Sequence, residues 1–111
     1  MIINKTRLVV LSKEEIKAKS MFRQTLGLMF TKRKNLVMIF SRLRVISLHN
    51  FFVFYPLEII VLNDSMKVIE IKKKFLPFTF WKSSAKGKYL IELGLEESKS
   101  KCKCGDVLEI K

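Results

Sequence analysis

The sequence is poor in the residues that build metal centres and disulfide frameworks. Its 111 residues include one histidine and two cysteines. Structural zinc takes four histidine or cysteine ligands, usually as spaced pairs, and the Cys102-Lys103-Cys104 stretch lacks that spacing. A disulfide across a single intervening residue would be strained. We therefore expect no metal, no other cofactor and no disulfide framework, with the cysteines acting as small buried hydrophobes.

Glycine and proline are also scarce, with four and two copies. The glycines are scattered along the chain, so no glycine-rich phosphate loop is present. No G-x-S-x-G nucleophile motif occurs either. Catalysis by a familiar mechanism therefore has no motif here, and whether the protein is an enzyme stays open. The lack of a linker rich in glycine, serine or proline favours a single domain over residues 1–111.

No apolar run is long enough to form a membrane-spanning helix. The longest, Phe51 to Leu62, has twelve residues and contains Pro56 and Glu58, whereas a spanning helix needs about 20 apolar residues. The first apolar stretch is interrupted by Lys5 and Arg7, unlike the apolar region of a signal peptide. We expect a cytoplasmic protein without a membrane span, and a monomer by default.

Acidic residues are outnumbered by basic ones. The chain has 22 lysines and arginines against 10 aspartates and glutamates, a net charge of +12. Such a charge attracts polyanions over long distances. The competing interpretation is a solvated surface, and lysine-rich surfaces are also typical of hyperthermophile proteins. The candidate polyanion contacts form two basic runs: Lys32, Arg33 and Lys34, and then Lys72, Lys73 and Lys74.

A third basic group lies next to a run of aromatic residues. Lys82, Lys86 and Lys88 follow the segment 78–81, which reads FTFW. Exposed rings beside basic residues suit stacking on unpaired nucleic-acid bases. Alternatively, these rings fill the core and the lysines solvate loops. No nucleic-acid-binding signature decides between the two.

The local patterns predict a first strand over residues 3–12, then one helix and further short strands. Ser12 to Glu15, SKEE, has the form of a capping box that opens a helix, and Gly27 is expected to end it. Segments 36–40, 44–49, 57–62, 66–72 and 88–93 are typical of strands. Residues 63–65, NDS, predict the turn of a hairpin over 57–72. We expect an α+β fold, a small, mostly antiparallel, barrel-like sheet with one N-terminal helix.

Five segments occur in the order found in one known family. They are FRQTLGLMF (22–30), LVMIF (36–40), HNFFVFYPLEIIVLND (49–64), KYLIEL (88–93) and CGDVLEI (104–110). Over about residues 7–111 the chain resembles the domain-of-unknown-function 192 family, also called uncharacterised protein family 0127. The resemblance implies a small barrel-like α+β domain and no established activity. Matched family positions are Arg23, Gly27, His49, Pro56, Glu58, Gly105 and Asp106, with glutamate at 58 replacing the family's aspartate.

His49, Pro56 and Glu58 stand in an apolar run where a buried strand does not require them. Our first hypothesis is a binding or accessory domain of unknown ligand, with any pocket near these three residues. The structural alternative is that His49 bonds a backbone carbonyl and Glu58 pairs with a basic side chain. Polyanion binding is the second hypothesis. The third is an unrecognised enzyme that uses Glu58.

Overall fold

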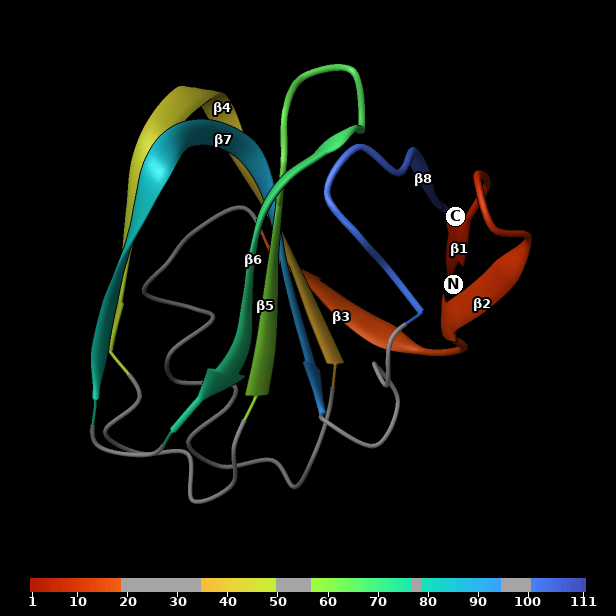
Figure 1. Ribbon diagram of the computed structural model, residues 1–111, viewed down its shortest axis with the longest axis horizontal. Helices are drawn as coiled ribbons and strands as arrows, with labels where there is room; N and C mark the ends of the chain where they lie inside the picture. The colour runs from red at the N-terminus through yellow and green to blue at the C-terminus, as the bar shows by residue number, and fades with distance from the viewer. Residues whose placement is uncertain (19–34, 50–56, 77–78, 95–100) are drawn as a thin grey trace.

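The computed structural model describes residues 1–18, 35–49, 57–76, 79–94 and 101–111 (Figure 1). In these ranges the regular elements are β-strands, arranged in two sheets. The smaller sheet has the order β2-β1-β8, formed by β1 (Ile2–Asn4), β2 (Val9–Ser12) and β8 (Leu108–Ile110). The larger sheet has the order β3-β4-β7-β5-β6, formed by β3 (Glu15–Ala18), β4 (Asn35–His49), β5 (Leu57–Leu62), β6 (Val68–Phe75) and β7 (Phe80–Gly94).

The expected α+β class with an N-terminal helix is wrong for the described residues. Ser12 ends β2, and Glu15–Ala18 form β3, which pairs in parallel with the start of β4. The Ser12 hydroxyl donates to the Glu14 carbonyl at 2.9 Å and accepts from Asn35 Nδ2 at 2.8 Å. Pairing with a distant strand therefore overrides the local capping signal. The rest of the expected helix, up to Gly27, lies outside the described residues, and no helix in the described ranges could span a membrane.

The hairpin predicted over residues 57–72 is confirmed. β5 pairs antiparallel with β6. The Asn63 side chain shapes the turn, since its Oδ1 accepts from the Ser65 and Lys67 amides at 2.9 and 3.0 Å. An asparagine side chain that bonds the backbone two residues ahead is a common way to begin a turn.

Both faces of the larger sheet carry buried apolar side chains. On one face, Leu57, Ile59 and Val61 join a core cluster that includes Phe40 and Ile46. On the other face, apolar side chains meet the smaller sheet; this second cluster includes Ile2, Leu11, Ile60, Leu62, Ile91 and Leu108. Alternate side chains of β5 therefore enter different clusters. This is why the strand reads as a continuous apolar run and not as an alternating one.

The two longest strands, β4 and β7, bend together into an arch (Figure 1). The register explains the bend, because each strand carries extra residues that the other does not match. Between the pairs Ile39↔Tyr89 and Arg44↔Gly87, β4 advances further than β7, and between Val45↔Lys86 and Ser47↔Lys82 β7 advances further than β4. Bulges of this kind bend strands and redirect side chains.

Gly87 allows close packing beneath this bend. A Cβ atom at this position would overlap Val61 Cγ1 and lie 3.0 Å from Ile46 Cδ1. The β7 bulge after Ser83 contacts a side chain of β6, although β6 and β7 are not neighbours in the sheet. The Glu70 carboxylate accepts from the Ser84 amide at 2.8 and 3.1 Å and from the Ala85 amide at 3.1 Å. The larger sheet therefore curls until its edge strand meets the first half of β7.

Candidate functional site

Three residues are predicted to line a ligand pocket. The structure describes His49 and Glu58, and Pro56 lies outside the described residues. His49 is the last residue of β4 and stands opposite Phe80 at the start of β7. Glu58 stands opposite Leu93, near the end of β7. The two positions therefore register with opposite ends of a bent strand. A shared pocket stays a prediction.

Glu58 is a buried carboxylate, 6% exposed, on the face of β5 that also carries Ile60 and Leu62. Its charge acts on the thiol of Cys102, a member of the core cluster between the sheets. Burial, followed by the charges of Asp106 and Glu58, raises the pKa of Cys102 to about 12. This thiol therefore stays protonated at neutral pH and is a poor nucleophile. Both cysteines are free thiols; Cys102 is buried as expected, but the same expectation is wrong for Cys104, which is exposed.

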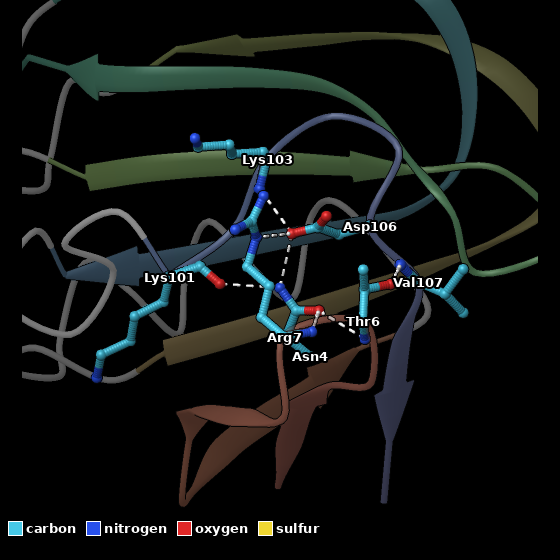
Figure 2. Close-up of polar contacts among 7 residues, drawn as sticks. All are labelled: Asn4, Thr6, Arg7, Lys101, Lys103, Asp106 and Val107. Atoms are coloured by element: carbon cyan, nitrogen blue, oxygen red, sulfur yellow. Dashed lines mark hydrogen bonds and ion pairs between the residues drawn. The ribbon is translucent and has the colours of Figure 1, made fainter.

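The densest polar cluster surrounds Asp106 and joins the start of the chain to its last described segment (Figure 2). Asp106 is 4% exposed. Its Oδ2 atom accepts hydrogen bonds from Arg7 Nε at 2.7 Å, Asn4 Nδ2 at 2.8 Å and the Lys103 amide at 2.9 Å. Burial alone would raise the pKa of the carboxyl, but these bonds, together with the charge of Arg7, hold the pKa below its usual value.

Asn4 organises the other side of this cluster. Its Nδ2 also donates to the Lys101 carbonyl at 2.8 Å, and its Oδ1 accepts from the Thr6 and Arg7 amides at 3.0 and 3.2 Å. Asp106 Oδ2 thus accepts hydrogen bonds from three protein groups, two of which lie near the start of the chain. This arrangement is typical of a structural anchor.

Gly105 and Asp106, two of the matched family positions, lie in a turn that the Asp106 amide closes by donating to the Lys103 carbonyl at 3.1 Å. Gly105 has φ +94°, a conformation that favours glycine. The Gly105 amide donates to the Val68 carbonyl and the Val68 amide donates to the Asp106 carbonyl, both at 2.8 Å. The turn is therefore tied to the start of β6. Among the other matched family positions, Arg23 and Gly27, like Pro56, lie outside the described residues.

The second notable region is a group of cations on the arch, which we call the basic bend: Arg42, Arg44, Lys82, Lys86 and Lys88. Lys88 is half-buried and the other four are exposed. No acidic residue occurs in segments 40–47 and 82–88. Glu70 reaches this region from β6, and its carboxylate accepts from two backbone amides there. The basic bend is therefore a surface of positive potential.

The bulges place these cations. Lys82 and Lys86 stand opposite Ser47 and Val45, which are two residues apart on β4, so both lysines share one face of the strand pair. Lys88 Nζ donates to the Ser41 carbonyl at 3.0 Å, and the Arg44 guanidinium lies 5.3 Å from the centre of the Phe40 ring. The latter geometry suits a cation–π contact. Arg44 is thus held near the bend without an acidic partner being required.

The described residues include two of the three basic groups predicted from the sequence. Lys32, Arg33 and Lys34 lie outside the described residues. Lys72, Lys73 and Lys74 are exposed on β6, the edge strand of the larger sheet, where lysine also discourages pairing with other chains. Lys82, Lys86 and Lys88 belong to the basic bend. Arg42 and Arg44 are not among the predicted contacts, because segments 36–40 and 44–49 resemble separate strands. The signal available is the pair of arginines in SRLR (41–44), where these segments meet.

The aromatic residues near the basic bend have different environments. Trp81 is partly buried and packs against the core cluster that contains Phe40. Phe80, the residue before it, is 75% exposed. Core filling therefore accounts for Trp81 and not for Phe80, and Phe78 lies outside the described residues.

Comparison with known proteins gives one sequence relative and two structural ones. No protein-family model matches the sequence. The chain is 32% identical over 97 residues to a UPF0127 protein of Thermococcus sibiricus (strain DSM 12597 / MM 739), an alignment that covers 83% of this chain and 62% of that protein. The chain therefore spans less than two thirds of that relative's length.

The fold is similar to two crystal structures. One is a proposed transcription regulator from Sinorhizobium meliloti 1021, with a TM-score of 0.75 and 19% identity over 84% of this chain and 78% of that chain. The other is a protein of unknown function from Novosphingobium aromaticivorans DSM 12444, with a TM-score of 0.73 and 20% identity over 85% of this chain and 72% of that chain. At these identities the likeness shows a shared fold alone.

Proposed function

Because the chain belongs to the uncharacterised UPF0127 family, we propose a function from its own surface, namely that it binds nucleic acid through the basic bend of β4 and β7. The observation that carries the proposal is the composition of the bend. Five basic residues lie on the two strand segments of the bend, Lys82 and Lys86 share one face of it, and these segments contain no acid. The net charge of +12 adds a long-range attraction of the same sign.

The chemistry of the bend suits phosphate groups. Arginine presents a planar fork of donors that matches phosphate oxygens, and lysine acts as a point charge. A protein that neutralises phosphates releases the counterions condensed on the nucleic acid, and this release favours binding most at low salt. Such contacts are independent of base sequence. The proposal is therefore one of binding without sequence selectivity at these positions.

The test compares two charge-reversal variants with the same change in net charge. Lys82→Glu/Lys86→Glu alters the basic bend. Lys5→Glu/Lys13→Glu alters two exposed lysines of the segments that form the smaller sheet, on the other side of the molecule (Figure 1). Binding to fluorescently labelled DNA at low salt is measured by anisotropy. We expect the bend variant to lose about tenfold or more in affinity relative to the control variant, since it loses two phosphate contacts that each raise affinity several-fold in dilute salt.

Three outcomes would contradict the proposal. Equal losses in the two variants would mean that net charge alone attracts the DNA. No binding by the unaltered protein at low salt would exclude the interaction. Binding to vesicles that contain an anionic lipid, without binding to DNA, would assign the basic bend to membrane surfaces instead.

A further inference from the structure

Phe80 is an exposed ring at the foot of the strand that carries the basic bend. Three quarters of its surface is open to solvent, whereas the next residue, Trp81, packs against the core. Most of the surface of Phe80 therefore faces solvent, beside the side chains that share its face of the strand.

The register places Phe80 in one row with two of the lysines. Phe80 stands opposite His49, Lys82 opposite Ser47 and Lys86 opposite Val45. The three β4 positions are each two residues apart, so their β7 partners lie on the same face. Burial agrees with this alternation, because Phe80, Lys82 and Lys86 are exposed and the intervening Ser83 is buried. One aromatic ring and two cations therefore share a solvent-facing row.

We propose that this row binds single-stranded nucleic acid, with an unpaired base stacked on Phe80 and the adjacent phosphates contacting Lys82 and Lys86. The inference rests on the proposed function and specifies its substrate class. A ring stacks on any unpaired base, whereas the bases of a duplex are already stacked on one another and are unavailable. A surface of lysine and arginine alone would bind duplex and single strand by charge.

The length of the row fits a short strand. From the position opposite Val45 to that opposite His49, the row spans four residue steps of β4, or about 13 Å at the rise of a β-strand. At about 3.4 Å per nucleotide, the rise of a fully stacked strand, this length corresponds to at most about four nucleotides, and a more extended single strand would place fewer along it. A single oligonucleotide can therefore contact Phe80 and both lysines at once.

The experiment measures three probes against three proteins. The probes are an oligothymidylate single strand, a duplex of matched length, and inorganic polyphosphate, which has the charge but no bases. The proteins are the unaltered chain, Phe80→Ala and Phe80→Trp. Since Phe80 is exposed, these variants should fold, and the fluorescence of Trp81 in Phe80→Ala checks this directly.

We expect Phe80→Ala to weaken binding to the single strand by about 5- to 150-fold, the range for loss of one stacked base. Binding to polyphosphate should stay unchanged, and Phe80→Trp should retain the affinity for the single strand. If Phe80→Ala alters no probe, or weakens all three equally, the inference is overturned while the proposed function stands. If the unaltered protein binds none of the probes at low salt, both are overturned.

Discussion

Asp106 shows how one carboxylate connects segments that lie almost a whole chain apart. Its Oδ2 atom accepts from Asn4 and Arg7 near one end and from Lys103 near the other. A buried carboxylate with several donors is stabilised in its charged form, and removal of the charge weakens the hydrogen bonds from all of those donors. Asp106 was predictable as part of a turn from the Gly-Asp pair. Its partners were not, because a single sequence does not show which residues meet over such a separation.

The first prediction concerns the acid sensitivity of this anchor. The pKa of Asp106 is lower in the folded protein than its ordinary value of 3.8, so the unfolded chain takes up the proton first as pH falls. The stabilising contribution is therefore fully present above about pH 4 and is lost as pH falls below it. We expect Asp106→Asn to lower the free energy of unfolding at pH 7 by about 1–3 kcal/mol. Asp106→Asn should also make the free energy of unfolding fall less steeply as pH drops below about 5, as measured by urea unfolding at several pH values.

Asp64 provides a matched control, since it is exposed in the turn between β5 and β6. Asp64→Asn makes the same chemical change and should alter the free energy of unfolding by no more than about 0.5 kcal/mol. The role assigned to Asp106 would be wrong if the two variants had the same stability at pH 7 and the same dependence on pH.

Among the elements, the β4–β7 pair decides both the fold and the candidate surface. The hairpin of β5 and β6 was predictable because its turn and its apolar strands are adjacent in sequence. The continuity of β4 was not, since the polar residues 41–44 resemble a loop and only the register with β7 shows a bulged strand. The parallel pairing of β3 with β4 was equally hidden, and a local SKEE signal favoured a helix instead. Local chemistry thus identified the local hairpin and failed where distant pairing decides the structure.

The second prediction tests the contact between β6 and the bulge in β7. Glu70 accepts the Ser84 and Ala85 amides, which the bulge leaves without strand partners. We expect Glu70→Ala to accelerate hydrogen exchange at these two amides, because local opening no longer breaks these bonds. Glu70→Gln retains an acceptor oxygen and should preserve part of the protection.

The amide of Leu90 provides the internal reference for this measurement, since Leu90 is fully buried at the centre of the sheet. Its exchange should change much less than that of Ser84 and Ala85. Uniform acceleration at all three amides would indicate general destabilisation, and unchanged exchange at Ser84 and Ala85 would show that Glu70 does not hold the bulge.

For the molecule as a whole, the question is whether the net charge of +12 is spread evenly over the surface or concentrated at a binding surface. The sequence predicted the excess of cations, and it identified three of the five residues in the basic bend. It did not show that two bulges bring Arg42 and Arg44 to the same region as the lysines of β7. Since the smaller sheet and the basic bend lie on different sides of the molecule (Figure 1), charge changes at the two places separate a local surface from net charge.

The salt dependence of binding to a single-stranded oligonucleotide tests the central claim most directly. For three to five phosphate contacts, the logarithm of the binding constant should fall linearly with the logarithm of the salt concentration, with a slope of about −2 to −3.5. Lys82→Glu/Lys86→Glu should make that slope shallower by about 1.4, whereas Lys5→Glu/Lys13→Glu should leave it nearly unchanged. A slope near zero, or the same slope in all three proteins, would contradict nucleic-acid binding at the basic bend.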